Sequence, residues 1–364
     1  MSDIVHQVDP DGDTVLILKN PGTPFAIWKI EPDKDARNEK VAKRRKISQG
    51  EKEMLSLAIE EEPTGVVDDD HAAIRYLVSS RHLALASGYF KSSLSQEGWM
   101  EGVRNEADGM YHLTTTDWDP DALLILLNIL HLHNRKVPRE LTLEMLAKMA
   151  VLIDYYRCAE ATEVFTAMWI EKTAESETVP SEYNRDLVLW MCVAWVFKIP
   201  STFETTTSIV IAQNNMPTVQ SMDLPIPNSV LEAIENERHH ALDSIFNCVQ
   251  VWLDKWCSSD YKCSFSGYNT QYDFACSSML IGALTKGLGY LNLSPRPETP
   301  FSGISVALIS TKLQGMSSPK LRIGPSSSIH ICNLDMTVKK SVIDIQTTVS
   351  GLRLDQFKDR AEEH

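Results

Sequence analysis

Five side chains in the second half of the sequence have the chemistry of metal ligands. Four of them could together supply the thiolate and imidazole donors of a structural zinc site; the five are Cys257, Cys263, Cys276, His330 and Cys332. Their spacing lacks the Cys-x-x-Cys pair common in such sites, and an isolated cysteine is usually a small buried apolar side chain. We therefore predict no metal ligand and no cofactor, and keep a zinc-dependent C-terminal domain as the alternative.

Two pairs of histidines are weaker candidates for metal binding. His131 and His133 are two residues apart near the end of a predicted helix, where a positive charge is favourable. His239 and His240 are adjacent within another predicted helix. Both pairs are explained more simply as polar helix side chains than as ligands.

Two glycine motifs fall short of enzyme signatures. Gly287-Leu-Gly289 lacks the third glycine of a dinucleotide-binding loop and has no strand before it. Ser305, in Gly303-Ile-Ser-Val-Ala307, lacks the final glycine of a nucleophile elbow, and no partner acid or histidine stands out. We predict no catalytic residue, with an enzyme built on the C-terminal domain as the competing class.

One basic run has a pattern typical of nuclear import signals: Lys43, Arg44, Arg45 and Lys46. It lies in residues 31–70, where 12 acidic and 8 basic side chains make half of the segment charged. So polar a segment buries too little apolar area to offset the entropy of ordering. We interpret it as a disordered insert carrying an import candidate, with a plain solvated charge run as the alternative.

The elements that must position these residues alternate in the first half of the chain. Hydrophobic patterns predict strands at 14–18, 24–30, 74–78 and 110–114, and helices at 80–90, 120–132, 141–155 and 159–169. The clearest helix start is Asp119-Pro120, a capping residue followed by a proline suited to the first turn. This pattern predicts an α+β fold.

The second half reads as almost wholly helical. A polar linker is expected at 172–180 and a helical C-terminal domain at 181–364. Residues 186–198 are apolar on all sides, which indicates a buried helix. Ser229-Val-Leu-Glu232 matches a capping box and predicts the start of a long helix.

The segment Leu77–Phe90 resembles the BTB/POZ signature, in which a strand runs into a short helix. Val78, Leu83, Ser87, Tyr89 and Phe90 stand at matching steps. The helix that begins at Asp119 looks like the family's next long helix. Its last residues, in Leu127-Asn-Ile-Leu-His-Leu-His-Asn-Arg-Lys-Val-Pro138, are similar to those of a BTB-containing group from filamentous fungi that carries a C-terminal helical domain.

The resemblance implies a BTB/POZ-like domain in residues 1–30 and 71–171, made of a small sheet flanked by helices. It further implies a noncatalytic interaction or adaptor protein, either a substrate adaptor of a cullin-type ubiquitin ligase or a nuclear regulator. Ser79 and Ser80 replace the family's charged pair. Residues 1–12 lack the period of a swapped helix, so we expect a monomer or a weak homodimer.

The composition of the chain favours other proteins as its binding partners, rather than nucleic acid or membranes. The chain has 364 residues and a net charge of −14, which disfavours direct binding to nucleic acid or an anionic membrane. Its longest apolar run, 187–197, is too short to span a bilayer, and the N-terminus lacks a secretory pattern. Seven cysteines suit reduced thiols, so we predict an intracellular protein of the nucleus, the cytoplasm or both.

Overall fold

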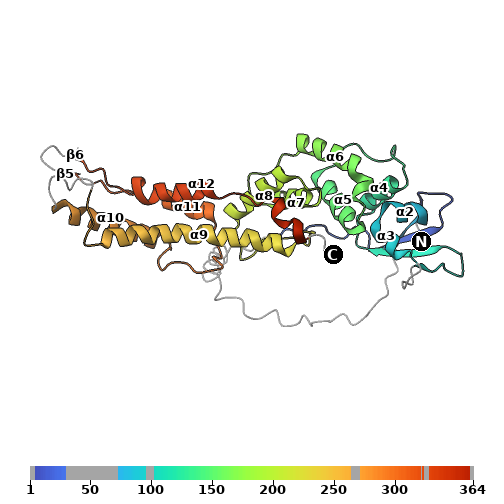
Figure 1. Cartoon of the computed structure of the whole chain (residues 1–364), viewed down its shortest axis with the longest axis horizontal. Helices are drawn as coiled ribbons and strands as arrows, with labels where there is room; N and C mark the ends of the chain where they lie inside the picture. The colour runs from blue at the N-terminus through green and yellow to red at the C-terminus, as the bar shows by residue number, and fades with distance from the viewer. Residues whose placement is uncertain are drawn as a thin grey trace, which may run out of the picture.

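The computed structural model of the protein describes residues 5–29, 73–95, 102–263, 271–320, 322–323 and 328–360. Within these ranges the fold is α+β, as the sequence predicts. A small sheet and several helices form a globular part, and a long helical arm, residues 241–348, extends from it (Figure 1). The predicted insert at 31–70, with the basic run Lys43–Lys46, lies outside the described residues.

Four strands form one sheet in the order β1-β3-β2-β4: β1 (Val5–Gln7), β2 (Thr14–Lys19), β3 (Ile74–Val78) and β4 (Tyr111–Thr116). The central β2 and β3 are antiparallel, whereas β1 runs parallel to β3 and β4 runs parallel to β2. Alternation along β2 buries Thr14, Leu16 and Leu18 on one face. The sequence predicts these last three strands to within two residues but does not predict β1.

The strand predicted at 24–30 is wrong. Residues 24–29 form no strand, and Ala26 has a left-handed backbone with φ of +49°. The backbone N–H and C=O of Lys29 each bond the side-chain amide of Gln220 at 2.9 Å. A side chain distant in sequence thus takes the backbone partners that a neighbouring strand would supply.

Helices cover the sheet and build the rest of the globular part. They are α2 (Ser80–Ala86), α3 (Gly88–Ser93), α4 (Pro120–Leu130), α5 (Leu143–Tyr156), α6 (Ala159–Ser176), α7 (Arg185–Val196) and α8 (Pro200–Gln213). The helix predicted over 80–90 is split because Ser87 is extended and its hydroxyl accepts a hydrogen bond from the Phe90 N–H. Helix α4 begins as predicted, because the Asp119 carboxylate accepts hydrogen bonds from the N–H groups of Asp121 and Ala122.

Helix α9 (Asn228–Cys257) runs from the globular part into the arm. Its 30 residues give it a length of about 45 Å. The predicted capping box at Ser229–Glu232 is wrong, since the helix starts directly after Pro227 without a side-chain cap. The rest of the arm comprises α10 (Gln271–Tyr290), α11 (Val306–Gln314), the short strands β5 (Arg322–Ile323) and β6 (Ser328–Ile329), the turn η2 (Asp335–Lys339) and α12 (Lys340–Thr348).

The chain returns from the arm to the globular part, as Figure 1 shows. Leu352 donates its N–H to the Thr207 hydroxyl of α8 at 2.9 Å. Leu352 and Leu354 are buried, and the turn η3 (Leu354–Arg360) follows. The arm is therefore a long excursion whose two ends are both fixed to the globular part.

Two hydrophobic cores meet within α9. The first contains the sheet, α2 to α8 and α9 as far as Ile234, and the second begins at Ala241. Between the predicted domains, at 172–180, helix α6 continues through Ser176 and the side chain of Thr173 is fully buried. Helix α7 belongs to the first core. Its neighbours there cover every face, which a helix that is apolar on all sides requires.

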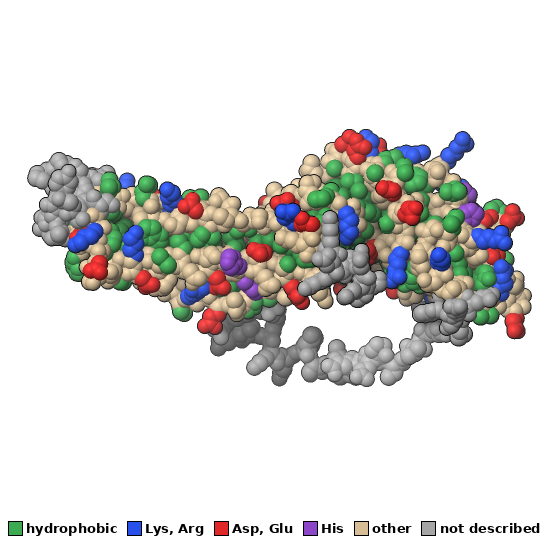
Figure 2. Space-filling view, viewed as in Figure 1, with side chains coloured by type: hydrophobic (Ala, Val, Ile, Leu, Met, Phe, Trp, Pro, Cys, Tyr) green, Lys and Arg blue, Asp and Glu red, His purple; other side chains and the backbone are tan. Residues whose placement is uncertain are grey.

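The face shown in Figure 2 carries acidic and basic side chains interspersed over the globular part and the arm. Within the described ranges, no helix combines the length and the apolar character needed to cross a membrane.

Candidate metal centre

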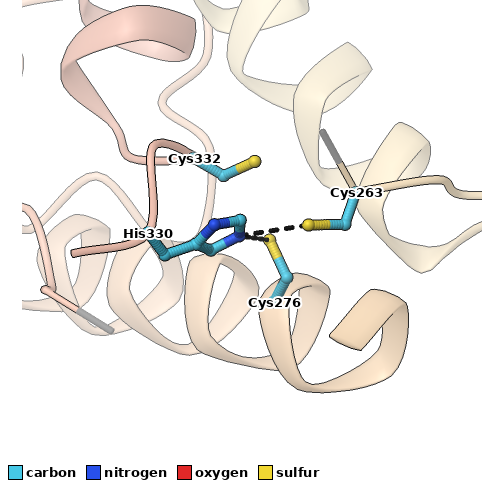
Figure 3. A group of neighbouring side chains, drawn as sticks. All are labelled: Cys263, Cys276, His330 and Cys332. Carbon is cyan, nitrogen blue, oxygen red and sulfur yellow. Dashed lines mark hydrogen bonds between the residues drawn. The ribbon is translucent and has the colours of Figure 1, made fainter. Parts of the chain in front are cut away.

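Four potential metal ligands converge near the outer end of the arm. The Sγ atoms of Cys263, Cys276 and Cys332 and a ring nitrogen of His330 all lie within 4.8 Å of one another. The side chains come from three segments and point toward a common centre, with the imidazole of His330 in contact with the thiols of Cys263 and Cys276 (Figure 3).

The first two ligands are positioned by the junction of α9 and α10. After α9 ends at Cys257, the chain turns, and Cys263 donates its backbone N–H to the Asp273 carboxylate at 2.8 Å. Asp273 is in the first turn of α10, and Cys276 follows three residues later on the same side of that helix. One carboxylate thus holds the turn that carries Cys263 beside the helix that carries Cys276.

The other two ligands directly follow strand β6. His330 and Cys332 are two residues apart, and the chain bends at Ile331 between them. The next residues anchor this segment: Leu334 is fully buried and donates its N–H to the Ser318 hydroxyl at 2.9 Å. The segment is held against the second core on the C-terminal side of its two ligands.

Distances within the cluster suit a tetrahedral ion. The Nε2 atom of His330 lies 3.1 Å from the Sγ atoms of both Cys263 and Cys276. In a tetrahedral zinc site with three sulfur ligands and one nitrogen ligand, neighbouring ligand atoms are about 3.5 to 3.8 Å apart. The observed separations lie on both sides of that range, so movements of about 1 Å or less would create the four-coordinate geometry.

Burial explains the protonation states that these groups hold without an ion. Cys263, Cys276 and His330 are at most 3% exposed. Burial raises the pKa of the Cys276 thiol to about 12, and the neighbouring Cys332 and Cys263 add to the rise. Burial lowers the pKa of His330, which keeps the imidazole neutral and able to coordinate. A bound cation would instead favour the deprotonated form of the thiols, because coordination to the metal removes their protons.

A hydroxyl group supports the cluster from outside. The Tyr261 hydroxyl lies 3.5 Å from Cys276 Sγ, and burial raises the pKa of Tyr261 well above its ordinary range. The hydroxyl therefore keeps its proton and can donate to a thiolate. Such outer contacts orient ligands and moderate their charge.

Other residues considered from the sequence lie elsewhere. Cys257 is exposed and is not part of the cluster, although the sequence groups it with the other four. His131 follows α4 and bonds backbone groups, and His239 lies in α9, 3.8 Å from Glu235. In the part of the chain that the structure describes, the cluster is the one group of three or more such side chains arranged to hold an ion.

Neither glycine motif has the surroundings of an enzyme loop. Gly287 and Gly289 lie inside helix α10, which continues to Tyr290. Ser305 caps helix α11, since its hydroxyl accepts the Leu308 N–H at 3.1 Å. Both segments therefore have a local structural explanation.

The interpretation as isolated buried thiols does not account for how the four side chains are arranged. The sequence contains one partial signal, the His-x-Cys spacing of His330 and Cys332, which puts two potential ligands in one short segment. The remaining ligands lie more than 50 residues earlier and come close only through the packing of α9 against α10.

Comparison with known proteins leaves the chain without an assigned family. No family model matches the sequence, and no curated protein matches it.

Proposed function

We propose that this protein is a noncatalytic interaction protein whose helical arm is held together by a structural zinc ion. The observation that carries the proposal is the convergence of Cys263, Cys276, His330 and Cys332 from three segments of the arm. Three thiolates and one imidazole are a donor set that zinc prefers, and they would fill all four positions of a tetrahedral ion. A centre whose ligands all come from the protein leaves no open position for substrate and serves folding.

The role of the ion would be to join three segments at the outer end of the arm, one of which carries the short hairpin of β5 and β6. The strands β5 and β6 have two residues each, too few to be stable alone. Zinc bound by Cys263, Cys276 and the segment after β6 would fix this hairpin to the end of α9 and the start of α10. Binding free energy of the ion would then contribute directly to the stability of the arm.

Metal analysis of the purified full chain tests the proposal. We expect one zinc ion per chain, removal of the ion by a strong chelator, and loss of thermal stability on removal. Cys276→Ser should lose the ion, while Cys257→Ser, an exposed thiol outside the cluster, should retain it. Cobalt substituted for zinc should give the absorption of a tetrahedral thiolate site.

The proposal would be wrong if the wild-type chain folds without zinc and its thermal stability is unchanged by the chelator. A Cys276→Ser chain that keeps a full equivalent of metal would also contradict the proposal, because Cys276 is a fully buried member of the cluster.

For the globular part we propose a BTB/POZ-like interaction module, in line with the sequence resemblance. Its support is the order of elements: antiparallel β2 and β3, the short helices α2 and α3, strand β4, then the longer helices α4, α5 and α6. Adaptor function for a cullin-type ubiquitin ligase is the first variant, and nuclear regulation through Lys43–Lys46 is the second.

Substitution at the tip of α4 tests the adaptor variant. Leu132 follows α4 and is 73% exposed, where an apolar side chain can contact a partner. We expect a cullin to copurify with the protein from its native cell and to be lost in Leu132→Arg. Val164→Arg, at an 80% exposed position on α6, is the matched control and should retain it. Absence of any cullin from the wild-type purification would exclude this variant.

A further inference from the structure

A cavity of about 320 Å³ lies where three parts of the globular structure meet. Its walls come from the loop after β2 (residues 23–27), from the loop before α4 together with α4 and α5, and from the loop between α8 and α9 (residues 222–224). This volume is at the lower end of the range for sites that hold small ligands or one large side chain.

Most of the wall is apolar. Pro24 and Phe25 line one side, Val151 and Leu152 of α5 line another, and Leu224 contributes from the loop before α9. Trp118 adds a second aromatic ring beside Phe25. An apolar group that enters this space would leave water, which is the main source of affinity in such sites.

The charged groups of the cavity are negative in excess. Lys148 is the basic side chain of the lining, and its ammonium is already bonded to Asp119 at 3.0 Å and to Glu144 at 2.9 Å. Asp117 and Asp223 also line the cavity, are exposed, and make no side-chain hydrogen bond or ion pair with any described residue. Two carboxylates from segments more than 100 residues apart thus remain available at one cavity.

The backbone holds these carboxylates in an unusual conformation. Asp117 and Asp223 have φ of +67° and +59°, and two further lining residues, Ala26 and Met222, are also left-handed. Such conformations are uncommon for residues other than glycine and persist where the surrounding structure fixes them. The rim of the cavity is therefore shaped by packing, which suits a preformed site.

We infer that this cavity binds an organic cation with an apolar body, namely an ammonium or guanidinium group attached to an aromatic or aliphatic group. The apolar body would lie against Phe25, Leu152 and Leu224, and the cation would lie at the rim between Asp117 and Asp223. The Lys148 ammonium already lies 5.7 Å from the centroid of the Phe25 ring, so Trp118 is the aromatic side chain of the lining that could contact the ligand's cation. The inference is independent of the metal centre, which lies in the arm.

Titration of the full chain with a defined amine tests the inference. The probe is 2-phenylethylammonium, and 2-phenylethanol is the neutral control of nearly equal shape, with binding followed by ligand-detected NMR. We expect the amine to bind more tightly than the alcohol, by up to about 25-fold, because each of the two exposed carboxylates contributes up to about fivefold.

Matched variants separate charge from shape. In Asp117→Asn with Asp223→Asn both charges are removed, and the left-handed backbone is kept because asparagine tolerates it. The preference for the amine should disappear in this variant and persist in Asp186→Asn, an exposed carboxylate outside the cavity lining. Equal binding of amine and alcohol to the wild type, or an unchanged preference in the double variant, would overturn the inference.

A second pair of probes identifies the natural source of the cation. Acetyl-Phe-Arg-amide stands for a basic side chain of a protein partner, and phenylethylammonium stands for a free amine. Tighter binding of the peptide assigns the cavity to a partner protein, and tighter binding of the amine assigns it to a small molecule.

Discussion

At the scale of single residues, the environment of His131 fixes its protonation state. The Nε2 atom lies 2.9 Å from the Ser79 backbone nitrogen and accepts a hydrogen bond from that N–H. The Nδ1 atom lies 2.9 Å from the Leu127 carbonyl oxygen and donates a hydrogen bond to it. This arrangement requires a neutral ring with the proton on Nδ1. Burial lowers the pKa of His131, and the nearby His82 ring, 5.2 Å away, acts in the same direction although the Leu127 bond opposes it.

A pH dependence of stability follows from this lowered pKa. The unfolded chain takes up a proton on His131 near the usual value of about 6.5, whereas the folded chain does so only at lower pH. The contribution of this residue is therefore fully present above pH 6.5 and is lost as the pH falls toward the folded pKa. We expect the free energy of unfolding of the globular part to decrease from pH 7.5 to pH 5.5 in urea denaturation.

Replacing the ring isolates this contribution. His131→Gln keeps a hydrogen-bond acceptor but does not titrate, so its unfolding free energy should change less over the same interval. His240→Gln, at an exposed position on α9, should follow the wild-type curve. If His131→Gln and the wild type lose stability in parallel, protonation of His131 is not the cause.

At the scale of secondary structure elements, the sequence predicts correctly those helices and strands whose limits depend on residues close in sequence. Helix α4 starts where Asp119 and Pro120 predict it, because its cap is formed by neighbours in sequence. Strand β3 is predicted to the residue, since its alternation reflects one buried face. The strand expected at 24–30 fails because its backbone partner is Gln220, almost 200 residues away.

The candidate metal centre shows that sequence patterns are limited in the same way for a site. Each of its four side chains was named from the sequence as a potential ligand, but their spacing favoured isolated thiols. Cys263 and His330 are 67 residues apart, and no local pattern encodes their contact of 3.1 Å. Proximity here depends on how the segment after β6 packs on the second core beside the junction of α9 and α10, which only tertiary structure determines.

At the scale of the whole molecule, α9 is a single helix shared by two cores. Its first turns pack with the globular part through Val230 and Ile234, and its later turns pack with α10 and α12 through residues such as Leu242 and Ile245. The closing segment at Leu352 returns to the first core. The two cores share α9 and also meet where α8 contacts α11 and at Val349, which packs against both. Most contacts of each core lie within that core, so we expect one core to keep most of its packing when the other is loosened.

Calorimetry of two variants tests this separation. Phe90 is buried in the first core and stacks on Tyr156 with 4.7 Å between ring centroids, so Phe90→Ala should destabilise that core by about 3 to 5 kcal/mol. Cys276→Ser removes a buried ligand of the proposed zinc ion in the second core. We expect two thermal transitions. Phe90→Ala should lower the midpoint temperature of the first core only, and Cys276→Ser or a chelator should lower the midpoint temperature of the arm. Cys257→Ser is the control and should leave both midpoints unchanged.

The double variant of Phe90→Ala and Cys276→Ser should show both shifts with additive magnitudes, because the two sites share no contacts. A single transition that both variants move would contradict the separation and would mean that α9 couples the arm and the globular part into one cooperative unit.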